Sequence, residues 1–202
     1  MWFNKNKNTP QKSIDKIRFV VLDTETTGFS FYKDRILCIG ALSIENNVIA
    51  VRNTFEVYVN QNIYNKETAK IHGILKNSKK SLIEEKEALL QFLDYLGDAV
   101  IIAHHAMFDI QMLNHALERQ GLPELKNEYI DTSRLYKKTL LKSNLLLKKE
   151  QYSLDELAEK FSISKEDRHT ALGDAFITAI AFLKILTLLK QKKEVTLRYL
   201  LK

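Results

Sequence analysis

The stretch Arg18-Phe-Val-Val-Leu-Asp-Thr-Glu-Thr-Thr-Gly28 decides the fold of this chain. Its apolar run, Phe19 to Leu22, is too short for a typical helix and has polar neighbours, so it predicts a buried strand. Asp23 and Glu25 follow at the end of that strand, and side chains two residues apart on a strand point to the same face. The two carboxylates are therefore expected to lie side by side.

Two neighbouring carboxylates repel each other, so this pair needs a compensating charge. At about 4 Å and an effective dielectric constant of about 20, the repulsion amounts to roughly 4 kcal/mol. A divalent cation held by hard oxygen ligands would compensate it. A solvated Asp-x-Glu in a polar loop is the alternative, and the rest of the chain has to decide between the two.

The composition of the 202 residues is that of an ordinary globular domain. Apolar residues make up 45% of the chain and charged residues 28%, as is usual for soluble proteins. The one cysteine, Cys38, excludes an intramolecular disulfide and fits a reducing cytoplasm. The sequence shows neither an uncharged apolar run of membrane-spanning length nor a secretory signal, so we expect a cytoplasmic protein without a membrane segment.

The basic residues are concentrated in three segments of the chain. Residues 1–18, 137–149 and 190–202 hold 15 of the 31 Lys and Arg residues but only two of the 25 Asp and Glu residues. The rest of the chain is therefore acidic, although the net charge is +6. An acidic body with basic flanks suits a metal-binding cleft beside edges that contact a polyanion. Plain solvation of Lys-rich segments would explain the same distribution.

The remaining pattern predicts a mixed α/β fold. Strands within 35–44 and 48–59, separated by Glu-Asn-Asn, give three antiparallel strands in succession. Later strands are expected at 100–103 and 129–130. A short helix that ends at Gly73 is expected within 62–76, and longer helices at 82–96, 106–119, 154–161 and 171–190. Strands followed by alternating helices and strands indicate a mixed sheet flanked by helices.

Local signals set several of the helix ends. Ser81 with Glu84, and Ser153 with Glu156, have the spacing of a capping box. Either Asp131 or its neighbour Thr132 could cap the helix that follows it.

We expect a single domain with polar extensions at both ends. Residues 1–17 form a basic lead-in, 18–190 the domain, and 191–202 a basic and apolar tail that could dock on the body or on a partner. Trp2 and Phe3, in the lead-in, could equally pack on the body or on a partner.

Three later residues could join the first carboxylate pair. Asp109 and Asp174 each stand in the first turn of a predicted helix, and His169 precedes Asp174 by five residues. The helix macrodipole alone favours a carboxylate in a first turn. Together, however, four carboxylates and a histidine near element ends suit two divalent metals that act on a phosphodiester. The histidine would then be the general base for the attacking water.

The chain resembles the DnaQ-type, DEDDh class of 3′-5′ exonucleases, which have the ribonuclease H-like fold. The family's three motifs match Leu22-Asp-Thr-Glu-Thr-Thr-Gly28, Ala103-His-His-Ala-Met-Phe-Asp109 and His169-Thr-Ala-Leu-Gly-Asp-Ala175. Shorter matches follow the family's order at 35–40, 71–74 and 130–132. The resemblance covers residues 18–190 and implies a mixed five-stranded sheet, with three antiparallel strands and then two parallel ones.

The resemblance also implies catalytic roles. Four carboxylates would hold two Mg²⁺ or Mn²⁺ ions: Asp23, Glu25, Asp109 and Asp174. Asp23 would bridge the ions, and His169 would deprotonate the attacking water.

Further residues would bind the terminal nucleotide. Its backbone and apolar contacts would come from Thr26, Thr27, Gly28 and Phe29, and its base pocket from Ile71, His72 and Phe108. Stacking on Phe29 and Phe108 would tolerate any base, because every base has a π-face; core packing is the alternative for both rings. The chain departs from the family at His105, where Asn is usual but where histidine could still donate a hydrogen bond to the substrate. It departs again at Cys38, where an acidic or amide residue is common. Substrate preference could therefore shift while the five catalytic positions are kept.

The implied activity is removal of nucleoside monophosphates from 3′ ends of single-stranded DNA, as in the proofreading subunit or domain of bacterial DNA polymerase III. The same chemistry on RNA or short oligoribonucleotides is the alternative, because recognition of the 2′-hydroxyl depends on loop geometry; we favour DNA. A DNA polymerase catalytic subunit is a candidate partner, although we favour a free-standing enzyme active in proofreading or repair. A non-catalytic binding module is a third hypothesis, disfavoured because all five reacting residues are present.

Overall fold

The computed structural model describes residues 13–75, 81–140 and 149–202. Trp2 and Phe3, most of the predicted lead-in and most of the basic stretch 137–149 lie outside these residues. The described chain opens with a short 3-10 helix, Ile14–Lys16, ahead of the first strand.

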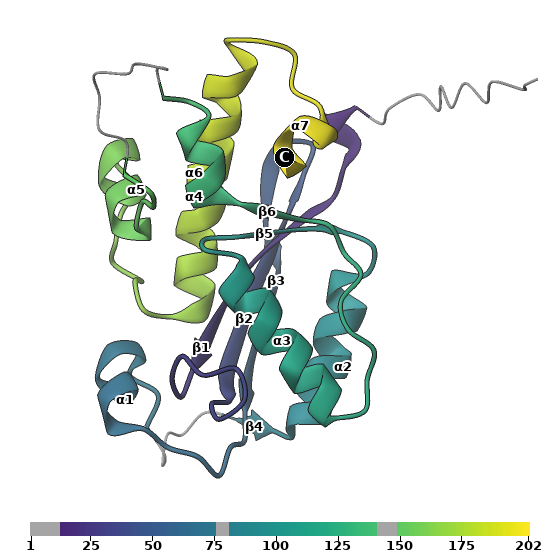
Figure 1. Cartoon of the computed structure of the whole chain (residues 1–202), viewed down its shortest axis with the longest axis vertical. Helices are drawn as coiled ribbons and strands as arrows, with labels where there is room; N and C mark the ends of the chain where they lie inside the picture. Colours follow the sequence, from purple (N-terminus) through teal and green to yellow (C-terminus); the bar gives the residue numbers. More distant parts are fainter. Residues whose placement is uncertain (1–12, 76–80, 141–148) are drawn as a thin grey trace, which may run out of the picture.

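A mixed sheet of six strands forms the centre of the described chain (Figure 1). The strands are β1 (Phe19–Thr26), β2 (Ile36–Glu45), β3 (Val48–Val59), β4 (Leu82–Ile83), β5 (Val100–Ala103) and β6 (Tyr129–Asp131), in the spatial order β4-β3-β2-β1-β5-β6. β1, β2 and β3 are successively antiparallel, whereas β5 and β6 run parallel to β1. The predicted fold class is confirmed, and β4 adds a short sixth strand at the edge.

A two-residue turn joins β2 to β3, where the Glu-Asn-Asn break predicted it. Asn46 and Asn47 both have positive φ angles, of 52° and 61°. Two-residue hairpins need this backbone conformation, and Asn tolerates it better than most residues do.

The second helix starts later than its sequence suggests. Leu82 and Ile83 form β4 beside the end of β3, and α2 (Glu85–Leu96) begins after them. The carbonyl oxygen of Ile83 accepts a hydrogen bond from the Asn60 backbone N–H at 2.8 Å. The predicted capping box at Ser81 and Glu84 is therefore wrong. The prediction failed because two apolar residues are too few to show a periodicity that distinguishes a strand from a helix.

Helices cover both faces of the sheet (Figure 1). α2 and α3 (Met107–Arg119) pack on one face, and the other face carries α4 (Thr132–Lys137), α5 (Leu154–Phe161), α6 (Ala171–Lys190) and α7 (Leu197–Leu201). α1 (Lys66–His72) stands apart beside the turn that follows β1. The alternation of β1 sends Val20 and Leu22 into the core under α2 and α3, and Phe19 and Val21 into the core under α6.

Two capping predictions are confirmed at the helices of the second face. The capping box of Ser153 and Glu156 begins α5, and the Asp131 side chain caps α4 by accepting hydrogen bonds from the backbone of Ser133 and Arg134. The tail contains α7, and Leu200 on that helix is buried against the body.

α6 is apolar around nearly its whole circumference. By length and composition alone it could cross a membrane, but more than half of its apolar stretch is buried against the rest of the chain. A helix that is hydrophobic all round is typical of the core of a domain as well as of a membrane. Its contacts with β1 and β2 place α6 in the core.

Gly40 allows the start of α6 to lie directly on the sheet. Gly40 pairs with Asp23 across β1 and β2. A Cβ atom at Gly40 would lie 2.3 Å from the backbone of Ala171 and Leu172, so no larger residue fits there. This close contact brings the first turn of α6, with Asp174, over the strand that carries Asp23.

Candidate active site

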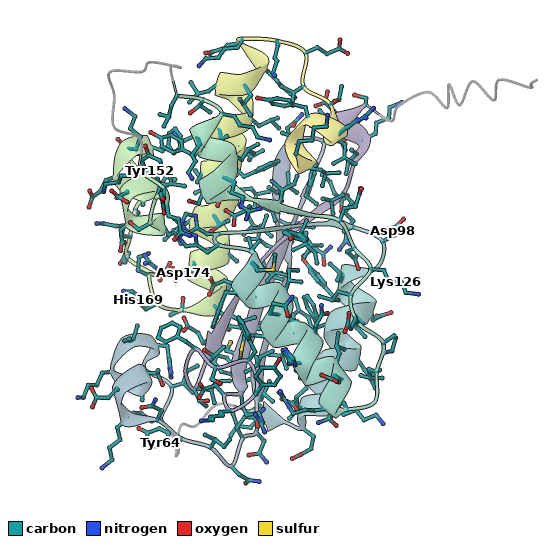
Figure 2. The ribbon with its side chains drawn as sticks, viewed as in Figure 1. Tyr64, Asp98, Lys126, Tyr152, His169 and Asp174 are labelled. Atoms are coloured by element: carbon teal, nitrogen blue, oxygen red, sulfur yellow. The ribbon has the colours of Figure 1, made fainter. Side chains whose placement is uncertain are left out.

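Three carboxylates converge where β1 passes under the start of α6. Asp23 and Glu25 come from one face of β1 and Asp174 from the first turn of α6, and one oxygen of each lies within 4.8 Å of the others. Figure 2 shows His169 close to Asp174 at this end of the helix. The structure thus brings together residues that are separated by about 150 positions in the sequence.

Asp109 stands next to this group, in the first turn of α3. The residue is 3% exposed, and its Oδ1 accepts hydrogen bonds from Thr24 N–H at 3.0 Å and from Thr24 Oγ1 at 2.7 Å. Thr24 lies between Asp23 and Glu25 and points to the opposite face of β1. The same strand therefore presents two carboxylates and fixes a third. This role of Thr24 was not predicted from the sequence.

Burial raises the pKa values of all four carboxylates, and repulsion by the other members of the cluster adds to this effect at Asp23 and Glu25. Burial, followed by the charges of Asp109, Asp174 and Glu25, holds the pKa of Asp23 well above its usual range. Burial first, and then the charge of Asp174, raises the pKa of Glu25 to about 7. Burial likewise raises the pKa of Asp109 to about 7, against the hydrogen bonds from Thr24.

The set of donors fits a divalent cation. All are carboxylate oxygens, which hard cations such as Mg²⁺ and Mn²⁺ prefer. A bound cation would remove the repulsion that raises these pKa values. Burying several charged carboxylates together costs free energy, so such a cluster needs a compensating positive charge.

One arginine also reaches the carboxylates. The Nη1 of Arg168 donates to Asp174 Oδ2, and its Nε donates to Asp155 Oδ1 at 2.8 Å. The Arg168 charge opposes the effect of burial on the pKa of Asp174, which nevertheless remains raised. Arg168 was not predicted from the sequence, although its position directly before His169, the first residue of the third motif, was a signal.

His169 occupies the turn immediately before α6. Its side chain is exposed and its φ angle is +65°, while its backbone N–H donates to Asp174 Oδ1 at 3.3 Å. Thr170 then caps α6 by accepting a hydrogen bond from Gly173 N–H. The backbone of His169 thus helps to hold a carboxylate, and its ring stays accessible to solvent.

Asp34 pins the loop that follows β1. Its Oδ1 accepts from Thr27 Oγ1 at 2.8 Å and its Oδ2 accepts from Ser30 N–H at 2.9 Å. Gly28 faces this carboxylate so closely that a Cβ there would lie within 2.8 Å of it. Thr27 is fully buried, so its side chain supports the loop and has no surface accessible to a ligand, whereas Phe29 is 80% exposed. Thr26 donates through Oγ1 to the carbonyl of Gly28.

The other residues predicted to bind the nucleotide come from the loop after β1, from α1 and from α3. The Phe29 and Phe108 rings pack at 5.9 Å between centroids, and Ile71 on α1 is exposed. The Nδ1 atom of His72 accepts from Ile74 N–H at 3.0 Å, which leaves the proton on Nε2. Nε2 is buried and has no partner among the described residues.

Of the two departures from the family pattern, Cys38 lies across the sheet from a carboxylate of the cluster, whereas His105 stands just before α3. His105 is partly exposed, in a left-handed conformation with φ +59°, at the start of α3. Cys38 is buried in β2 and pairs across the sheet with Glu25. The departure at Cys38 therefore lies beside Glu25.

Comparison with known proteins identifies a family to which the chain is similar. A model of the RNase_T family, described as an exonuclease, matches residues 20–182. This range contains all four carboxylates and His169.

Two curated relatives carry names from DNA replication. The chain is 32% identical to the DNA polymerase III subunit epsilon of Aquifex aeolicus, over 83% of this chain and 80% of that protein. It is 36% identical to the PolC-type DNA polymerase III of Caldanaerobacter subterraneus subsp. tengcongensis, over 86% of this chain. That alignment spans only 12% of the polymerase, so the chain corresponds to a small part of its length.

A solved structure shares the fold. Exonuclease I of E. coli, in complex with a dT13 oligonucleotide, superposes with a TM-score of 0.73 at 15% identity. The match covers 88% of this chain and 42% of that protein.

Proposed function

The chain belongs to the RNase_T exonuclease family, and from this we propose that it removes nucleoside monophosphates from the 3′ ends of single-stranded DNA. The observation that carries the proposal is the convergence of Asp23, Glu25 and Asp174 beside the buried Asp109. Such a set of hard oxygen donors is suited to metal-assisted hydrolysis of a phosphodiester.

In this proposal the four carboxylates hold two divalent cations, Mg²⁺ or Mn²⁺. Bound cations would supply the charge that activates a water and stabilises the oxygens of the phosphodiester. Thr24 and Arg168 fix the orientations of Asp109 and Asp174, respectively. His169 is the general base: its ring is exposed at the rim of the site and can pass a proton to solvent.

The terminal nucleotide would rest on the loop after β1. Phe29 and Phe108 offer ring faces for stacking, and Ile71 adds an exposed apolar surface from α1. The Nε2–H of His72 has no partner among the residues that the structure describes, so a polar group of the nucleotide would satisfy this donor. His105 can donate a hydrogen bond where the family usually has Asn. Thr26, Thr27 and Gly28 hold the loop that carries Phe29.

DNA is the proposed substrate because the relatives are named as components of DNA polymerase III and the structural neighbour was solved with a DNA oligonucleotide. For the same reason we place the enzyme in the cytoplasm, in proofreading or repair. We propose that it works without a polymerase subunit, because the buried apolar residues of the tail, Val195 and Leu200, pack on its own body. Co-purification with and without residues 191–202 tests this last point.

The direct test compares 5′-labelled single-stranded DNA and RNA of one sequence, with Mg²⁺ or Mn²⁺. We expect a ladder that shortens from the 3′ end on DNA, no ladder for Asp23→Ala, and an unchanged one for Asp94→Ala on the exposed face of α2. A ladder mainly on RNA would support the assignment of the site but would make RNA the substrate. Absence of a ladder on both, with metal bound, would contradict the proposal.

A further inference from the structure

Arg168 connects one carboxylate of the site to a helix outside it. Its Nε and Nη2 donate to the two oxygens of Asp155 on α5, at 2.8 and 3.3 Å, while its Nη1 donates to Asp174. The Arg168 side chain is 15% exposed and that of Asp174 is 9% exposed. The guanidinium is therefore a mostly buried bridge between α5 and the first turn of α6.

The geometry of this bridge depends on arginine. A guanidinium has five N–H donors in a rigid plane, so one edge can hold Asp155 in a two-pronged contact while the other reaches Asp174. A lysine ammonium carries the same charge but cannot keep two carboxylates in fixed directions. Arg168 also directly precedes His169, so the bridge fixes the turn in which the proposed base stands.

The charge of Arg168 has a second effect on the site. Among the described residues, no other ion pair joins a basic side chain to one of the four carboxylates. A positive charge at this place offsets part of their mutual repulsion when no metal is present. The same charge repels an incoming divalent cation, because both compete for Asp174.

We propose that Arg168 is a positioning residue and the built-in counter-ion of the metal site. It holds Asp174 and the turn of His169 against α5, stabilises the metal-free protein, and lowers the affinity of the site for cations in return for a fixed geometry. The inference rests on the proposed function only in that the four carboxylates bind divalent cations.

The proposal predicts opposite changes in two measured quantities. Loss of the Arg168 charge removes a repulsion, so cation affinity should rise, whereas loss of the bridge releases Asp174 and the turn of His169, so turnover should fall. A residue that only maintains the fold would lower both.

The experiment measures Mn²⁺ binding by calorimetry in the absence of substrate, at a pH above the pKa values of Glu25 and Asp109. Thermal unfolding is measured in parallel, with and without the ion. Arg168→Gln should bind Mn²⁺ about fivefold or more tightly than the wild type. Its melting temperature should be lower without metal and close to that of the wild type with saturating Mn²⁺. Arg52→Gln, on exposed β3, changes the net charge equally and should change neither quantity.

Two further variants separate charge from geometry. Arg168→Lys and Asp155→Asn retain the positive charge but break the two-pronged contact, so turnover on single-stranded DNA should fall about tenfold without tighter Mn²⁺ binding. Asp155 is about half exposed, so its substitution should leave the fold intact.

Weaker Mn²⁺ binding by Arg168→Gln, or loss of its stability even with saturating Mn²⁺, would overturn the proposal. Failure of the proposed function would look different. The wild type would then bind Mn²⁺ without shortening DNA, and the binding and unfolding measurements would still decide the role of Arg168.

Discussion

At the scale of single residues, the four carboxylates differ in what orients them. Asp109 is held by Thr24 and Asp174 by Arg168, whereas Asp23 and Glu25 are positioned by their places on β1. Groups that hydrogen-bond to a metal ligand fix its direction and tune its affinity. The residues that orient a carboxylate should therefore matter nearly as much as the carboxylate itself.

Thr24→Val tests this for Asp109. Valine has nearly the same shape but no hydroxyl, so Asp109 would lose the 2.7 Å bond and keep only the backbone bond at 3.0 Å. We expect Mn²⁺ affinity and turnover to fall about tenfold, as is typical of such supporting groups. Thr24→Ser, which restores the hydroxyl, should recover most of the loss. Equal affinity in the valine variant and the wild type would contradict the role.

His169 offers a test of the general base. Its positive φ angle suits asparagine better than alanine, so His169→Asn removes the imidazole with little backbone strain. Turnover should fall about 10²- to 10⁴-fold. Mn²⁺ affinity should change little, because His169 contacts Asp174 through its backbone N–H, which asparagine keeps. Unchanged turnover at saturating DNA would remove His169 as the base.

At the scale of elements, local chemistry made most of the fold predictable. The turn at Asn46 and Asn47 and the capping box of Ser153 each act within a few residues, so the sequence alone contains the whole signal. β4 was mispredicted because Leu82 and Ile83 pair with a strand distant in sequence. An edge contact of two residues leaves no pattern of its own.

Gly40→Ala tests the contact between β2 and α6. The added methyl group would meet the backbone of Ala171 and Leu172 at 2.3 Å, and backbone atoms cannot rotate away as a side chain can. We expect a loss of about 1–3 kcal/mol in the free energy of unfolding, measured by urea denaturation. Because α6 would also shift relative to β1, Mn²⁺ affinity should fall with it. A variant that loses stability but binds Mn²⁺ normally would show that Asp174 does not depend on this contact.

At the scale of the whole molecule, motif spacing predicted which residues would meet but could not predict what supports them. Asp23 was recognisable because it stands two residues before a second carboxylate beside a predicted strand, and Asp174 because it stands in the first turn of a predicted helix. The bond between Thr24 and Asp109 and the bridge from Asp155 through Arg168 depend on how helices cross the sheet. Thr27 is a further case in which the motif did not predict the packing. The motif indicates a contact with the substrate, but the residue is completely buried.

The carboxylate cluster should make the metal-free protein less stable as pH rises. In the folded state the pKa values of Glu25 and Asp109 are about 7, whereas the unfolded chain has values of about 4. Between these values the folded state binds more protons than the unfolded state, so the free energy of unfolding contributed by these groups falls with rising pH. His104 acts in the opposite direction in the same range, because burial lowers its pKa to about 4.

A neutral variant separates the cluster from His104. In Asp23→Asn combined with Glu25→Gln, two of the raised groups no longer titrate while His104 is unchanged. Without metal, this double variant should gain melting temperature over the wild type as pH rises from about 4 to about 7, by at least about 3 °C at the upper end. Saturating Mg²⁺ should stabilise the wild type and leave the variant unaffected, because metal binding requires ionised ligands. A constant difference in melting temperature between the two proteins across this range would mean that repulsion within the cluster does not limit stability. The cluster would then not need a cation to compensate its charge.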